Sequence, residues 1–522
     1  MSCHVKEQAS ETGISITVPL FLFVAAFSIR VFFLLVVLDY HAYFPKYVEL
    51  AGRFMGELSP PIEIFYSSPF YIVLLAFLKS VFSLEVEQIK FFQILVGSFN
   101  VVLIYFAGKE FFNSKVAFLA AVLSIFYAPL VLHDSSLLTA TYVISFNLLG
   151  LLAFSRFLMC GGMLFLTLAG FSWGLSLITR PNIFLFIVII AISLLFPRKI
   201  GLKKQSLLCF FVFLVSFLLP VVPVTGLNYL RSGELVWINN SGGWVFYCSN
   251  NRNSTGVGFH PPPELMKIGA RNYLTRKIGV GYTEHLDSIT MARELTKEHL
   301  SHKEVSCYWF LQGLEEIKKN PRRFLNLLAR KSFYALNQFE AHDTMETTLD
   351  DWRMASIPLF NFGMIISFAL VGAIFINGTI KNTRWLLIFY LLSYFLSLII
   401  FYVIPRFRLP AEPVLLICAS HAIFLFFDLI HLKKIKTILV LGLLLAIFSF
   451  VTHVSDRNIR LHREIAMPNA VRLSRGIRLL KIGEVSQAIS LLEKILELNP
   501  QDKTAKYCLE MAYQKLGIVN QP

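Results

Sequence analysis

Long apolar runs are the feature that most constrains the fold of this 522-residue chain. Each run is about 18–25 residues long, the length that a helix needs to cross roughly 30 Å of hydrocarbon. Hydrophobic residues make up 56% of the chain, above the roughly 45–50% found in soluble domains. The sequence therefore predicts a polytopic α-helical membrane protein. Its net charge of +15 is partly explained by basic loops that fix a topology, and does not argue for nucleic-acid binding.

These runs predict about eleven transmembrane helices. They cover 14–38, 91–112, 114–133, 137–158, 162–179, 182–197, 205–227, 357–376, 384–404, 411–430 and 435–453. The stretch 69–82 is short for a span and contains Lys79. We expect it to lie in the interface or to dip into it, although a crossing at this point stays open.

The basic loops 197–204, 381–384 and 431–436 fall on one side with the N-terminus if 69–82 does not cross. The positive-inside rule then places the N-terminus in the cytoplasm. The first span is expected to be retained as a signal anchor, because its apolar run is too long for a cleaved signal and no small-residue cleavage site follows. We expect a multi-pass protein of the cell (inner) membrane.

This topology predicts four parts: a membrane module 1–227, a loop domain 228–356, membrane helices 357–453 and a tail 469–522. The first extracytoplasmic loop, 39–90, lies within the membrane module. This loop, the loop domain and the tail are expected in a periplasm or equivalent lumen. Extracytoplasmic cysteines can pair. Cys248 and Cys307 are therefore either bridged or free thiols.

The tail carries small residues at Gly476 and Ala488, which allow two helices to pack closely, and Pro500 ends the second helix. A further helix follows, and Gly517 lies 34 residues after Gly483. This pattern resembles a tetratricopeptide repeat, once in full and once in half. It implies a protein partner or packing on the loop domain.

A carboxylate ends the first span, in LVVLDYHAYFPKY (35–47). An ionisable group at a span end marks a candidate functional site, although a carboxylate wetted by headgroup water is the alternative. The stretch 46–58 can form an amphipathic surface helix, and 67–78 returns to the interface. Together they would cover a cavity open to lipid and to the outside. Asp39, with His41 and Tyr43 beside it, would face this cavity.

Asp134 ends the third predicted span at a similar depth on the same side. Two such carboxylates could hold an acceptor hydroxyl and a divalent cation, whereas a wet loop is the alternative. Whether a metal is used stays open.

Arg406 and Arg408 lie at an outer span end, against the positive-inside bias. Arginine forms forked hydrogen bonds to phosphate, and snorkelling to headgroups is the alternative. Arg180 is a similar case, and Glu340 is a weaker candidate for substrate binding. No Walker loop, zinc-protease or serine-hydrolase motif is present.

Seven segments together resemble the GT-C class of membrane glycosyltransferases, nearest to the protein O-mannosyltransferase-like family (glycosyltransferase family 39) and its bacterial relatives, which include the lipid A aminoarabinose transferase. They are LDYHAY (38–43), SPFY (68–71), QILVGSFNVVLIYFAGKEFF (93–112), AGFSWGLSLITRPN (169–182), SGGWVFYCSNN (241–251), the helical stretch 307–340, and PRFRLPAEP (405–413).

The resemblance implies a polyprenyl-phosphate-linked sugar donor and an acceptor hydroxyl on protein or lipid. Asp39 would act as the base in an inverting attack, and Arg406 and Arg408 would hold the leaving phosphate. Many relatives carry Asp-Glu in the first loop, whereas this chain has Asp39-Tyr40, so His41 or Asp134 could replace the glutamate. A lipid or sugar transporter (or flippase) and an en bloc glycan ligase are the alternative functions.

Overall fold

The computed structural model describes residues 16–37, 46–196, 206–258, 261–262, 280–339, 360, 362–376, 383–456, 459, 472–473, 476, 479–480, 483–498 and 503–515. Across these residues the fold is helical, and its β-type pairs are two isolated bridges, Tyr127 with Phe360 and Val257 with Val403. The predicted helical class is confirmed.

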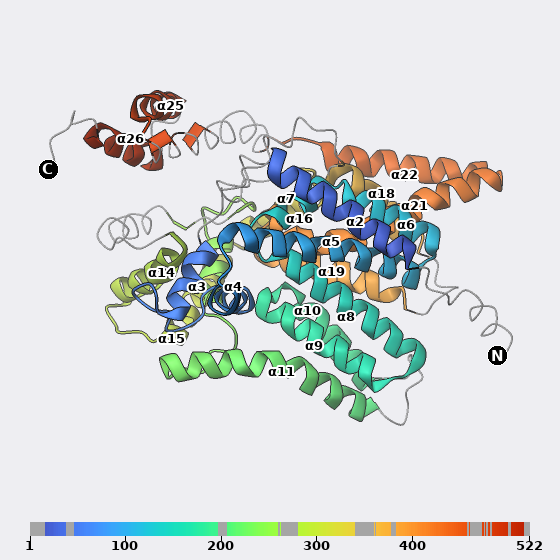
Figure 1. Ribbon diagram of the computed structural model, residues 1–522, viewed down its shortest axis with the longest axis horizontal. Coiled ribbons are helices and arrows are strands. Elements are labelled where there is room, and N and C mark those ends of the chain that lie inside the picture. The colour runs from blue at the N-terminus through green and yellow to red at the C-terminus, as the bar shows by residue number, and fades with distance from the viewer. Residues whose placement is uncertain are drawn as a thin grey trace.

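Six helices in the described residues are long and apolar enough to cross a membrane. They are α2 (Thr17–Phe32) continued by η1 (Phe33–Val37), α5 (Val86–Phe111), α8 (Ala140–Cys160), α11 (Ser206–Ser232), α20 to α21 (Pro405–His431) and α22 (Ile435–His453). Several of them run side by side across Figure 1. This arrangement supports a multi-pass membrane protein.

Shorter apolar helices account for the other predicted spans. They are α6 (Ser114–Ile125), α9 (Met163–Thr179), η2 (Pro181–Ile183) with α10 (Phe184–Leu195), α18 (Phe362–Ile374) and α19 (Trp385–Ile400). The predicted span 114–133 is divided, because Pro129 begins a separate helix α7 (Ala128–Ser135). The total of eleven crossings stays a prediction.

Helices α8, α9 and α11 pack closely in the bundle. Gly174 of α9 lets the backbone of α11 approach, since a methyl group there would lie 2.3 Å from the carbonyl oxygen of Phe217. Small residues at helix contacts are the usual basis of close packing in membranes. This packing fixes the end of α9, where Arg180 follows.

The loop domain contains α12 (Gly242–Asn250), α14 (Val280–Thr296), α15 (His302–Lys319) and α16 (Pro321–Leu336). Its core joins α12 to α15 through Trp244 and Trp309, whose ring centroids lie 4.5 Å apart. It contacts α3 (Lys46–Met55), the helix predicted from 46–58, and α3 packs on α4 (Pro69–Phe82). Figure 1 shows α3, α4, α14 and α15 gathered at one end of the bundle.

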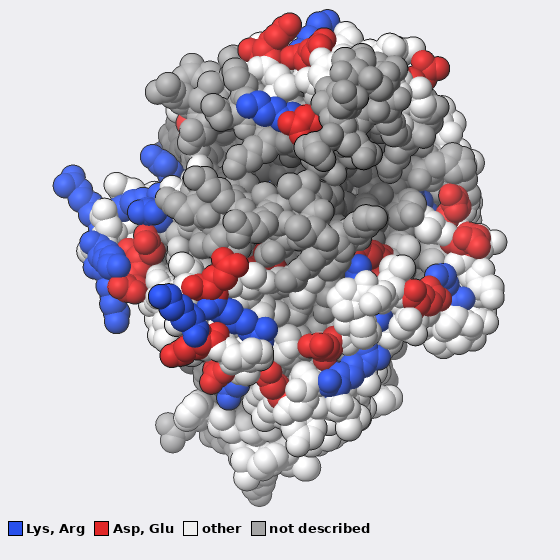
Figure 2. Space-filling view, turned by 90° about the vertical axis from the view of Figure 1, so that its left-hand side faces the viewer, with Lys and Arg blue, Asp and Glu red and all other residues white. Residues whose placement is uncertain are grey.

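The ends of several distant helices meet beside this domain. The backbone N–H of Gln338 donates to the carbonyl of Thr452 near the end of α22, and the Tyr334 hydroxyl donates to Asp456. Arg384, from a predicted cytoplasmic loop, instead donates to the carbonyl of Phe111 at the far end of α5. Each of these contacts joins segments that are predicted to lie on the same side. Figure 2 looks onto the loop-domain end, where charged side chains of both signs are spread over the described surface.

In the tail, α25 (Val485–Leu498) packs on α26 (Lys503–Lys515) around Ala488, Leu492 and Ala512. A methyl group on Gly476 would lie 3.3 Å from Leu492, so this glycine does permit close packing. The tetratricopeptide assignment stays a prediction. Cys248 is buried, Cys307 is exposed, and both are free thiols.

Candidate functional site

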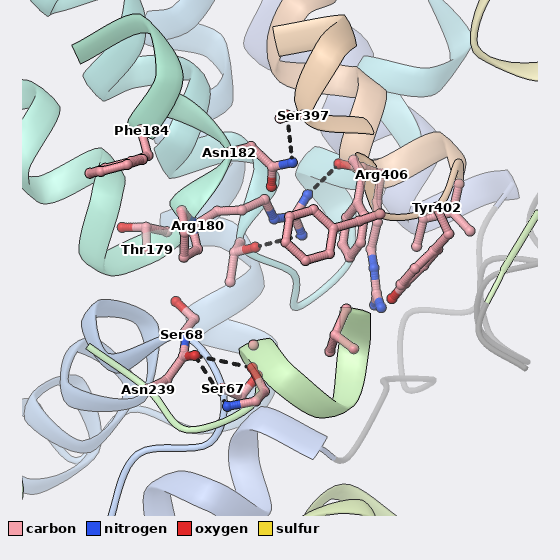
Figure 3. Close-up of a pocket in the computed structure, with 18 of the residues that line it drawn as sticks. Ser67, Ser68, Thr179, Arg180, Asn182, Phe184, Asn239, Ser397, Tyr402 and Arg406 are labelled. Atoms are coloured by element: carbon pink, nitrogen blue, oxygen red, sulfur yellow. Dashed lines mark hydrogen bonds between the residues drawn. The ribbon is translucent and has the colours of Figure 1, made fainter. Parts of the chain in front are cut away.

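A cavity of about 820 Å³ opens where the loop domain meets the ends of the membrane helices. Its walls come from the starts of α3 and α10, the segment before α4, the ends of α9 and α19, and residues around α12 and α20. Segments from both halves of the chain thus enclose one space (Figure 3).

Arg180 is directed to this cavity by the residue that follows it. Pro181 disfavours a helical conformation at the preceding residue, so α9 ends at Thr179 and Arg180 is extended, with φ −155° and ψ 120°. Its guanidinium donates to the carbonyl of Arg406 at 2.6 Å and to the Thr139 hydroxyl at 3.1 Å. Arg180 is only 8% exposed. It therefore acts mainly as a tie between α9 and the segment that carries Arg406.

Arg406 lies on α20 (Pro405–Arg408), a single helical turn that Pro405 begins. Its side chain is half-buried and lines the cavity. Figure 3 shows it reaching into the space between α20 and α12, beside Tyr402. The guanidinium carbons of Arg180 and Arg406 lie 4.3 and 5.3 Å from the centroid of the Phe407 ring. This ring helps to fix both cations.

The opposite wall is polar and neutral. Ser68 caps α4 by accepting a hydrogen bond from the backbone N–H of Tyr71, and Ser67 donates to the Tyr47 hydroxyl at 3.4 Å. Asn239 and Ser241 complete this wall. Hydroxyl and amide groups of this kind can bind a sugar or an acceptor.

The charge of the described lining favours an anion in this cavity. Lys46, Arg180 and Arg406 line it, and no Asp or Glu is among its described lining residues. Its apolar side includes Phe184, Leu185 and Phe401. Phe184 is 53% exposed at the start of α10, so the cavity reaches a helix surface suited to lipid. Cations beside an apolar wall match an amphiphile with an anionic headgroup.

Asp134 lies outside this cavity. It is buried, and its carboxylate accepts from Arg30 Nε at 2.8 Å and from the Thr141 hydroxyl at 2.7 Å. Both carboxylate oxygens are therefore engaged in holding α2 to α7 and α8.

Arg408 is also separate from the cavity. Its Nε lies 3.3 Å from Glu412 Oε1, its Nη1 donates to the carbonyl of Asn337 at 3.0 Å, and it stacks on the Phe362 ring. Arg408 and Glu412 are each 1% exposed. Arg408 thus joins the loop domain to the membrane helices.

Four candidates, Asp39, His41, Tyr43 and Glu340, lie outside the described residues. Of the nearest described residues on either side of the first three, Val37 packs near Val131 and Leu132, and Lys46 lines the cavity. Among the residues that the structure describes, no three His, Cys, Asp or Glu side chains form a metal site.

A buried lysine supports the loop-domain side of the cavity. Lys331 Nζ donates to Asn250 Oδ1 at 2.8 Å, and Asn250 Nδ2 donates to the carbonyl of Ile400, a lining residue. Burial lowers the pKa of Lys331 to about 7, because desolvation disfavours the charged ammonium.

Sequence reasoning did not find Lys46 or Arg30. Lys46 follows Pro45 in the stretch that carries Asp39. A basic residue on the predicted outer side runs against the positive-inside rule, and this could have marked Lys46 as a candidate. Arg30 is the charged residue inside the apolar run 14–38, and such a residue needs a partner.

Residues 67–224 match the sequence model of a family described as dolichyl-phosphate-mannose-protein mannosyltransferase. This segment is therefore similar to that glycosyltransferase family. It contributes to the cavity the lining residues Ser67, Ser68, Thr139, Thr179, Arg180, Pro181, Asn182, Phe184 and Leu185. The expected resemblance is confirmed over this segment.

The structure is similar to oligosaccharyltransferase chains from Archaeoglobus fulgidus. An apo form is 15% identical, with a TM-score of 0.46, and the match covers 96% of this chain and 60% of that chain. The AglB complex with an inhibitory peptide and a dolichol-phosphate is 13% identical, with a TM-score of 0.41, and the match covers 86% and 58%. The chain thus spans less than two thirds of the length of these proteins. No curated protein sequence matches it.

Proposed function

We propose that this protein transfers a sugar from a polyprenyl-phosphate-linked donor to an acceptor hydroxyl on the extracytoplasmic face. The observation that carries the proposal is the cavity between Arg406 and Phe184, whose described lining joins three cationic side chains to an exposed apolar wall. The family match, whose described members act on a dolichyl-phosphate sugar and protein, supports this donor class.

Arg406 would contact the phosphate that leaves. Negative charge grows on this phosphate as the sugar–oxygen bond breaks, and a fixed guanidinium stabilises that charge. Arg180 would hold the carbonyl of Arg406 and so orient the turn. Lys46 would add a third positive charge from α3. The prenyl chain would leave along Phe184 and α10.

Asp39 would take the proton from the acceptor hydroxyl, which then attacks the anomeric carbon opposite the phosphate and inverts it. The chain that bears Asp39 joins Val37 to Lys46, and Lys46 lines the cavity. General-base catalysis of this kind is worth about 10²–10⁴ in rate. Asp134 would act by fixing α2 through Arg30.

Transport is less well supported than transfer. A transporter places its polar groups near the middle of the membrane, whereas these cations gather at helix ends beside the loop domain. Transfer of a whole glycan is the alternative that the mass of the transferred group would reveal in the test below.

The test is a mass-spectrometric comparison of envelope lipids and exported proteins from cells with the wild-type protein, a deletion, Asp39→Asn or Arg406→Gln at equal levels. Glu315→Gln is the control, because Glu315 is exposed and its known partner is Lys319 on the same helix. One glycoform should vanish from the deletion and both site variants, and its mass and carrier would identify the sugar and acceptor. A glycoform lost only from the deletion would refute the assigned roles.

A further inference from the structure

A second cavity, of about 300 Å³, lies on the loop domain at the start of α16. It is formed by the first residues of that helix and by the segment that follows α12. Its described lining consists of three arginines, two asparagines, a serine and a leucine: Arg322, Arg323, Arg330, Asn320, Asn326, Ser254 and Leu327.

Helical spacing brings these side chains together. Arg322, Asn326 and Arg330 are four residues apart on α16 and so share one face. Leu327 is 3% exposed and forms the apolar base. Arg323 is held by the loop, because its Nη2 donates to the carbonyl oxygens of Arg252 at 2.5 Å and Ser254 at 3.4 Å. The site is therefore built from two segments of the chain.

The charge around this cavity is unbalanced. Its described lining contains no Asp or Glu, and within the described part of the chain none of its three arginines has an acidic partner within 4.0 Å. The acidic side chain of Glu315 on neighbouring α15 is paired with Lys319. Like charges gathered around one small cavity repel each other, so an anion bound here would relieve this repulsion.

We propose that this cavity binds a phosphate-class anion. Guanidinium groups match the geometry of phosphate oxygens through paired N–H donors. Asn320, Asn326 and Ser254 add neutral polar groups around the same space. The anion is either the headgroup of an anionic phospholipid or a soluble phosphate group, since both present the same oxygens.

This site is distinct from the donor cavity, but one segment of the chain contributes lining residues to both. Ser254 lines the second cavity, whereas Val257 and Gly258, a few residues later, line the first. An anion that orders this segment would therefore also order one side of the donor cavity. The proposal does not depend on the transfer reaction.

The test compares two double variants of the full-length protein in neutral detergent. Arg322→Gln/Arg330→Gln removes two exposed cavity cations, and Lys318→Gln/Lys319→Gln removes two exposed cations of α15 that do not line it. Both would be made in an Arg406→Gln background to weaken the donor cavity. Binding of inorganic phosphate would be followed by phosphorus NMR, with the unfolding midpoint as a check on folding.

We expect the arginine pair to weaken phosphate binding about tenfold or more, because charged hydrogen bonds are lost, and the lysine pair to leave it within about twofold. Native mass spectrometry from nanodiscs of phosphatidylglycerol or phosphatidylcholine separates the sources. Retention of phosphatidylglycerol alone, lost in the arginine pair, assigns a lipid headgroup, whereas phosphate binding without this preference assigns a soluble ligand. Equal loss in both pairs, or no binding of either ligand, would overturn the proposal.

Discussion

Arg406 and Arg408 are separated by one residue, yet the structure gives them opposite roles. Arg406 is half-buried and lines the donor cavity. Arg408 is buried with Glu412 at 3.3 Å and bonds the carbonyl of Asn337. We predict that Arg406→Gln impairs catalysis with little effect on stability, whereas Arg408→Gln destabilises the fold.

The expected magnitudes follow from these surroundings. Removing one partner of a buried ion pair leaves the other charge without compensation and costs about 3–5 kcal/mol, so Arg408→Gln should lower the unfolding temperature clearly. Arg408→Gln/Glu412→Gln removes both charges and should recover much of the loss. Arg406→Gln should change the free energy of unfolding by about 0.5 kcal/mol or less and slow transfer about 10²–10³-fold.

The assay combines thermal unfolding of detergent-solubilised protein with single-turnover sugar transfer at saturating donor. The double variant is the control that separates an unpaired charge from a loss of packing. If Arg406→Gln unfolds as readily as Arg408→Gln, or if Arg408→Gln is as stable as wild type while transfer stops, the assignment of the two arginines is wrong.

Three further predictions test other parts of the structure. In the wild type, Lys331 is protonated below its ordinary pKa of 10.5 when the chain is unfolded, but only below about 7 when it is folded. The free energy of unfolding of the wild type should therefore rise between about pH 7 and pH 10.5. Lys331→Met should remove this rise, which chemical denaturation at several pH values would measure. Gly97→Ala should reduce thermal stability, because the added methyl group would lie 2.3 Å from Asp134 Cγ and disturb the buried ion pair between Asp134 and Arg30. Gly226→Ala is the matched control, because a methyl group there meets nothing within 4 Å. In single-cysteine variants, an impermeant maleimide should label exposed Cys307 in intact cells and exposed Cys160 only after permeabilisation, and the reverse pattern would invert the predicted topology.

The sequence predicted the helical class and the positions of the apolar helices, because apolar length is a direct physical requirement for spanning. It also placed Arg180 and Arg406 at outer helix ends, where the structure brings them to one cavity. It could not determine the partners of buried charges. Asp134 was expected to face the acceptor, but its carboxylate is engaged by Arg30, which lies 104 residues earlier. Such long-range pairing depends on how α2 packs, which apolar composition does not specify.

The different roles of Arg406 and Arg408 could be inferred from the sequence more readily than the partner of Asp134. Pro405 favours the first turn of a helix, and residues two apart on a helix do not face the same way. A pair in this setting therefore cannot both point into one cavity. The structure satisfies this condition by directing Arg408 to Glu412 and leaving Arg406 at the cavity.

Two prolines build the cationic side of the donor cavity. Pro181 ends α9 and holds Arg180 extended, and Pro405 begins the turn that carries Arg406. The hydrogen bond from Arg180 to the Arg406 carbonyl joins these two turns across 226 residues of sequence. Because proline fixes its own φ angle, each proline restricts the backbone of its turn before any ligand binds. Preorganised donors need little reorganisation as charge develops on a leaving phosphate. This rigidity is the physical reason to expect that the cavity acts in catalysis as well as in binding.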